Sequence, residues 1–62
     1  MNKDIMRDLL DGQAASFRMI SRRNTETFVE TEDDFFKGKA EAYKLAAETF
    51  ERIIRNYLPL ED

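Results

Sequence analysis

The stretch FFKGKAEAYKLAAETFERIIRNY, residues 35–57, decides how this chain folds. Aromatic residues recur in it every seven positions, and smaller apolar residues fall between them at alternating steps of four and three. Apolar residues at this spacing line one side of an α-helix and form the seam of a helix–helix contact. The members of this ladder are Phe36, Ala40, Tyr43, Ala47, Phe50, Ile54 and Tyr57. An aromatic ring opposite a small alanine lets two helices approach closely, so the ladder predicts a long helix packed on another helix.

The second helix is predicted over about residues 32–58. Thr31 is a suitable cap, and the acidic residues 32–34 that follow suit the positive first turn of a helix. Pro59 disfavours helical backbone in the residue before it and so marks the end.

A first helix is predicted over about residues 3–23, with Asn2 as its N-cap. Six of its large apolar residues fall within one arc of about 140°, the width of an ordinary buried face. They are Ile5, Met6, Leu9, Leu10, Phe17 and Ile20. Arginines at 18, 22 and 23 suit the negative C-terminal end of a helix.

Residues 24–30 are predicted as a loop. Asparagine, here Asn24, can take the left-handed conformation that often ends a helix, and Thr25 and Thr27 have poor helix propensity. A short β-hairpin within residues 16–30 is the alternative, because apolar and polar residues alternate on both sides of a polar turn at 22–24. The first interpretation makes the chain, residues 1–62, a single all-α domain: a two-helix antiparallel hairpin.

Association with a second copy is the next inference. The apolar arc of the second helix spans about 160°, which is wider than one neighbouring helix covers. A hairpin of 62 residues is also below the size that folds securely alone, and without cysteine no disulfide can reinforce it. We therefore expect a homodimer that forms a four-helix bundle, with the ladder residues as its interface.

The expected helix lengths support the same conclusion. Helices of about 21 and 27 residues measure about 31 and 40 Å, so the second helix would extend beyond the first by one to two turns. In an isolated hairpin this overhang would leave Ile54, Tyr57, Leu58 and Leu60 partly uncovered. Lys39 also projects into the apolar arc. We expect its stem to pack while its ammonium reaches water; the alternative is a specific pair with a buried acid or with Gln13.

The residue types exclude most catalytic chemistry. The chain has no histidine and no cysteine, so it can form neither a Ser-His-Asp site nor a thiolate zinc site. Gly12 and Gly38 are isolated and form no phosphate-binding loop. Asp4, Asp8 and Asp11 share one helix edge, but they lack the glycine turn of a calcium loop. We expect no enzyme activity, no cofactor and no metal site.

Composition points to a soluble intracellular protein. Charged residues make up 37% of the chain, hydrophobic residues 42%, and the formal net charge is −3. No apolar run approaches the roughly 20 residues of a membrane-spanning helix, and the polar N-terminus has no signal-like stretch. We expect a cytoplasmic protein that makes no membrane contact.

Arg18, Arg22 and Arg23 cluster near the predicted end of the first helix and are the candidates for nucleic-acid contact. The acidic segment 26–34 follows directly, and the chain is acidic overall. We therefore expect this cluster to be neutralised locally, which makes a small nucleic-acid-associated regulator the alternative and not the main hypothesis.

The stretch FFKGKAEAY, residues 35–43, together with the two-helix plan, resembles small uncharacterised bacteriophage and prophage proteins. Such proteins often bind a host or phage protein as inhibitors, adaptors or assembly helpers. The resemblance implies that role for this chain and assigns no residue to it.

The main hypothesis is therefore a non-enzymatic protein–protein interaction module. Phe28 and Val29 in the expected loop, and Leu45 on the charged side of the second helix, are the candidate contacts with a partner protein. A structural subunit whose second helix completes the bundle of another protein is a further possibility.

Overall fold

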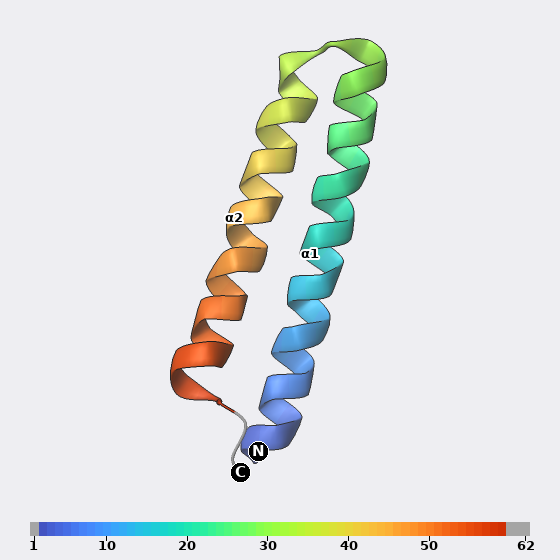
Figure 1. Ribbon diagram of the computed structural model, residues 1–62. Helices are drawn as coiled ribbons and strands as arrows, with labels where there is room; N and C mark the ends of the chain where they lie inside the picture. Colours follow the sequence, from blue (N-terminus) through green and yellow to red (C-terminus); the bar gives the residue numbers. More distant parts are fainter. Residues whose placement is uncertain (1, 60–62) are drawn as a thin grey trace.

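The chain forms two antiparallel α-helices joined by a tight turn (Figure 1). This computed structural model describes residues 2–59. Helix α1 spans Lys3–Thr31 and α2 spans Asp34–Tyr57, with Glu32 and Asp33 between them. The molecule is a rod of 45 × 19 × 15 Å. The prediction of an all-α antiparallel hairpin is confirmed.

The loop predicted over residues 24–30 is wrong, because α1 continues through this segment to Thr31. The β-hairpin alternative within residues 16–30 is wrong for the same reason. Ser21, Asn24 and Phe28 continue the four-and-three spacing of the residues before them, and each is half-buried. Burial along α2 therefore outweighs the weak helix propensity of the segment, which amounts to only tenths of a kcal/mol per residue.

The polar side chains of this segment bond to the helix itself. The hydroxyls of Thr25, Thr27 and Thr31 donate to carbonyls four residues earlier, at 3.1, 3.0 and 2.8 Å. The Asn24 amide donates to the Ile20 carbonyl at 2.8 Å. Side chains that often end a helix are accommodated here without breaking the hydrogen-bond ladder.

The turn is capped on both sides. Glu32 ends α1 in the left-handed conformation, at φ 57°, and its N–H donates to the Phe28 carbonyl at 2.6 Å. The Asp33 carboxylate accepts the Phe35 N–H at 3.0 Å and caps α2. Thr31 is therefore not the cap; its hydroxyl accepts the Asp33 N–H at 3.2 Å. The N-cap predicted for α1 is confirmed, since the Asn2 side chain accepts the Ile5 N–H at 2.9 Å.

The predicted overhang of the second helix is wrong. With 29 residues, α1 is the longer helix, because it includes the segment expected to be a loop. Leu58 closes the open end of the hairpin and is buried, Ile54 is half-buried, and only Tyr57 stands clear of α1. Leu60 lies outside the described residues.

Small residues bring the two helices together. The Ser21 hydroxyl of α1 donates to the Ala40 carbonyl of α2 at 2.7 Å. Ala14 lies seven residues before Ser21, and Ala47 lies seven residues after Ala40. Because the helices are antiparallel, Ala14 and Ala47 lie at the same height along the hairpin. Both alanines are buried, as is Ala40. Because these side chains are short, the Ser21 hydroxyl of α1 reaches the main chain of α2 directly.

One aromatic ring fills the space between these small-residue levels. Phe17 of α1 stacks against Tyr43, with ring centroids 5.9 Å apart, and against Phe50, at 5.6 Å. Offset stacking of this kind adds about 0.5–1.5 kcal/mol per pair to the burial of the rings. The hairpin thus alternates narrow levels of alanine and serine with one wide aromatic level.

Candidate interaction surface

The ladder residues of α2 pack mainly within the chain. Ala40 and Ala47 are buried, and Phe36, Tyr43, Phe50 and Ile54 are half-buried along the side of α2 that meets α1. Tyr57 is 72% exposed. The chain's own first helix thus occupies much of the surface predicted as a dimer interface. Contact of these residues with a second copy stays a prediction.

The side chains flanking the seam give the flat hairpin two different faces. In an antiparallel pair, the positions just beyond the seam on one side of each helix fall on the same face of the pair. One such face carries apolar and small residues from both helices, and we call it the apolar face. It is represented by Met6, Leu9, Ile20, Ala42, Ala46 and Ile53. Most of these side chains are exposed, Leu9 by 56%, Met6 by 40% and Ile53 by 37%.

The opposite side, here called the charged face, carries acids and bases of both signs. It is represented by Asp8, Asp11, Arg18, Arg22, Lys44, Glu48, Glu51 and Arg55. A surface of interspersed charges is well solvated and needs no cover. The asymmetry between the two faces is the most specific feature of this surface.

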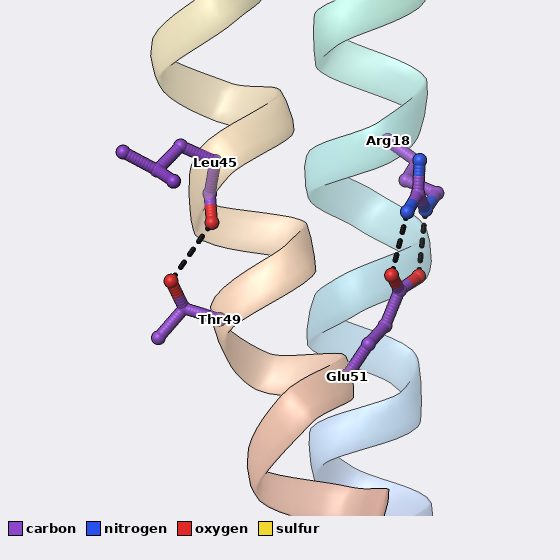
Figure 2. Close-up of polar contacts among 4 residues, drawn as sticks. All are labelled: Arg18, Leu45, Thr49 and Glu51. Carbon is purple, nitrogen blue, oxygen red and sulfur yellow. Dashed lines mark hydrogen bonds and ion pairs between the residues drawn. The ribbon is translucent and has the colours of Figure 1, made fainter.

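One ion pair joins the helices across the charged face. Arg18 Nε donates to Glu51 Oε2 at 2.6 Å and Arg18 Nη2 donates to Oε1 at 2.5 Å, a two-point contact that Figure 2 shows. The hydrogen bond from Arg18 lowers the pKa of the Glu51 carboxyl below its usual value. The same bond raises the pKa of Arg18.

The arginine cluster is divided by the fold. Arg18 pairs with Glu51, and all three arginines are exposed. Consecutive helical residues point about 100° apart, so Arg22 lies on the charged face and Arg23 lies on the apolar face. The structure does not bring the three guanidinium groups together on one surface, and nucleic-acid contact stays a prediction.

The three residues predicted to contact a partner protein do not gather at one place. Phe28 is half-buried in the seam, with the Lys37 ammonium 5.9 Å from the centre of its ring. Val29 is 70% exposed in the last turns of α1. Leu45 is 61% exposed and points away from α1 at the outer edge of α2, beside Thr49 (Figure 2). They do not form one continuous patch.

Lys39 lies at the turn end of the apolar face. Its side chain is half-buried, and its ammonium sits 5.5 Å from the centre of the Phe35 ring. Its stem therefore covers apolar surface while its charge meets an aromatic ring that is itself 62% exposed. Gln13, the alternative partner, is exposed in the first half of α1.

The open end of the hairpin has a shallow hollow between the two helices. Its wall carries two acids, Asp8 and Asp11, and two bases, Arg7 and Arg55. Asp4, the third member of the predicted acidic edge, pairs with Arg7 at 3.1 Å. Among the described residues, no group of three or more acidic side chains gathers to hold a metal ion.

Sequence reasoning did not single out the apolar face as a surface. Its signal was present in the apolar arc of the second helix, about 160°, which is wider than one neighbouring helix covers. Half of the apolar arc of each helix faces the other helix, and the remaining halves lie side by side on one face. Only the antiparallel pairing shows that they join.

Within residues 2–59, neither helix has the length and the apolar character that crossing a bilayer requires. Comparisons with protein-family models, with curated proteins and with solved structures found no match for this chain.

Proposed function

We propose that this chain is a non-enzymatic protein–protein interaction module that acts as a homodimer of hairpins. The observation that carries the proposal is the small core of the single hairpin. Among the described residues the buried apolar side chains are Ala14, Ala40, Ala47 and Leu58, and no large side chain is fully buried. A chain of this size needs more apolar burial, or a staple, to be stable. Association supplies the burial.

The surface area supports the same proposal. The hairpin exposes 4918 Å², whereas a compact protein of 7.3 kDa exposes about 4,200 Å². Its radius of gyration is 14.1 Å, against about 10.6 Å for a compact domain of this length. A second hairpin laid against the first would bring both quantities toward those of a compact protein.

The partner of the dimer is proposed to be another protein. Both signs of charge are interspersed on the charged face, which disfavours a purely electrostatic ligand such as nucleic acid. The resemblance to small phage proteins that bind host or phage proteins points the same way. Leu45 and Val29 are the exposed apolar residues proposed for this contact, and they lie outside the apolar face.

Sedimentation velocity over a dilution series tests the first part of the proposal. We expect a species of twice the 7.3 kDa chain mass at micromolar concentration. A stably folded monomer at micromolar concentration would overturn the homodimer.

A pull-down from lysate with tagged protein tests the second part. Leu45→Glu should lose a captured protein that the wild type and Lys44→Glu both retain. The Lys44 variant is the control, because it places the same new carboxylate one residue away on the charged face. Equal capture by both variants would remove Leu45 from the contact.

A further inference from the structure

We propose that the apolar face is covered by the same face of a second copy, with the turn of each hairpin lying over the open end of the other. This inference rests on the homodimer proposed above and goes beyond it by naming the surface and the orientation. The twofold axis would lie between the two faces and perpendicular to the helices, at the level of Ser16 of α1 and Ala46 of α2.

A compact dimer of two hairpins would bury enough surface to be stable. Two separate hairpins expose twice 4918 Å², whereas a compact protein of twice the mass exposes about 6,900 Å². Packing the two copies into a compact bundle would therefore remove about 2,900 Å² in total, more than the roughly 1,600 Å² of a standard stable interface. The charged face cannot supply this contact without stripping water from Asp8, Asp11, Arg22 and Arg55, which is costly.

Charge selects the orientation. The apolar face carries two charged residues, Arg23 and Lys39, both basic and both near the turn. If the two turns lay at the same end, α1 of one copy would lie along α2 of the other, with residues of equal height facing each other. Arg23 would then face Lys39 of the second copy, twice in each dimer. Like charges placed opposite each other are destabilising, so the opposite orientation is favoured.

In the favoured orientation, each basic stem meets an apolar residue of the other copy. The twofold axis brings together residues that lie equally far on either side of Ser16 or of Ala46. Arg23 and Leu9 each lie seven residues from Ser16, so Arg23 of one copy meets Leu9 of the other. Lys39 and Ile53 each lie seven residues from Ala46, so they meet in the same way. The aliphatic part of each long side chain can then cover a leucine or isoleucine, while its charge reaches water at the rim.

Side-chain size also fits this orientation. Ser16 and Ala46, at the centre, are small enough to let the helices of the two copies approach closely. Phe35 and Tyr57, eleven residues on either side of Ala46, are 62% and 72% exposed. The orientation brings the Phe35 ring of one copy to the Tyr57 ring of the other, which gives both exposed rings a partner.

Two neighbouring substitutions test the surface. Ser16 lies on the apolar face and Ala15 on the charged face, and both are exposed in the single hairpin. We expect Ser16→Glu to weaken dimerisation at least tenfold in sedimentation equilibrium, because the two new carboxylates would meet at the twofold axis. Ala15→Glu should leave the dissociation constant unchanged. Circular dichroism checks that both variants stay helical. If both variants dimerise like the wild type, the surface is wrong while the homodimer stands; if the wild type is monomeric, the homodimer itself is wrong.

Single cysteines test the orientation, and the absence of natural cysteines leaves no background. In the proposed dimer, residue 16 of one copy lies beside residue 16 of the other, and the same holds for residue 46. The cysteine introduced by Ser16→Cys or by Ala46→Cys would therefore lie within disulfide distance of the same cysteine in the second copy. Each variant alone should therefore form a cross-linked dimer under mild oxidation. With the two turns together, residue 16 would instead face residue 46 of the other copy. Cross-linking only when both cysteines are present would therefore overturn the orientation.

Discussion

Arg18 of α1 and Glu51 of α2 form two parallel hydrogen bonds between the helices, and theirs is the only ion pair between the helices in the described part of the chain. Both side chains are partly exposed, with 46% and 37% of their surface accessible. Their contribution therefore depends on geometry and on protonation more than on burial.

Glu51→Gln should lower the thermal midpoint at pH 7 by removing the charge of this pair. The pKa of Glu51 is lowered in the folded chain. The stabilisation is therefore fully present above the pKa that Glu51 has in the unfolded chain, and it is lost as the pH falls through the pKa of Glu51 in the folded chain. The difference between wild type and variant should therefore shrink as the pH drops below the ordinary carboxyl value of 4.5. Circular dichroism melts from pH 7 to pH 2 measure this. Glu41→Gln, at an exposed position, is the control, and a difference that persists at pH 2 would contradict the assignment.

Ser21→Ala should lower the free energy of unfolding by about 1 kcal/mol, because it removes the hydroxyl that donates to the Ala40 carbonyl across the seam. Thr25→Ala is the matched control. Its hydroxyl also donates to a main-chain carbonyl, but within its own helix, and alanine has the higher helix propensity. Urea denaturation should separate the two variants. Equal effects would mean that the bond between the helices adds nothing.

Ala47→Leu should destabilise the hairpin by about 1–3 kcal/mol. Ala47 is 0% exposed, and a larger side chain there would push α1 and α2 apart at a level where the backbones are close. Ala15→Leu, at an exposed position on α1, should change the free energy of unfolding by no more than about 0.5 kcal/mol. Chemical denaturation of both variants provides the comparison. An unchanged Ala47→Leu variant would show that this level is not closely packed.

Glu32→Gly should stabilise the protein by about 0.5–1 kcal/mol. The residue ends α1 at φ 57°, a conformation that glycine adopts without the steric cost borne by other residues. Glu30→Gly, inside the last turns of the same helix, should instead cost about 1 kcal/mol. If thermal melts showed that both substitutions raise the midpoint, or that both lower it, strain at the turn would be ruled out.

The candidate surface could be predicted only in part. The width of the apolar arc of α2 indicated that this helix has more apolar surface than a single neighbour covers. Which residues remained for a partner depended on the rotation of each helix in the hairpin. That rotation places Ser21 and Ala40 at the seam, where they share a hydrogen bond. Leu45 was correctly expected to be exposed, whereas Phe28 lies half-buried in the seam because α1 continues past it.

The sequence by itself determined the helical class, the start of α1 at Asn2, the course of α2 and its end before Pro59. These features depend on local signals: a cap, a proline, and an apolar spacing repeated over three heptads. The tertiary structure alone decided where α1 ends and which residues share a face. Apart from Glu26 and Glu30, residues 24–31 are weak helix formers, and only contact with α2 supplies the burial that keeps them helical. The two-faced surface is likewise a property of the pair, because it exists only once two antiparallel helices place their flanking positions side by side.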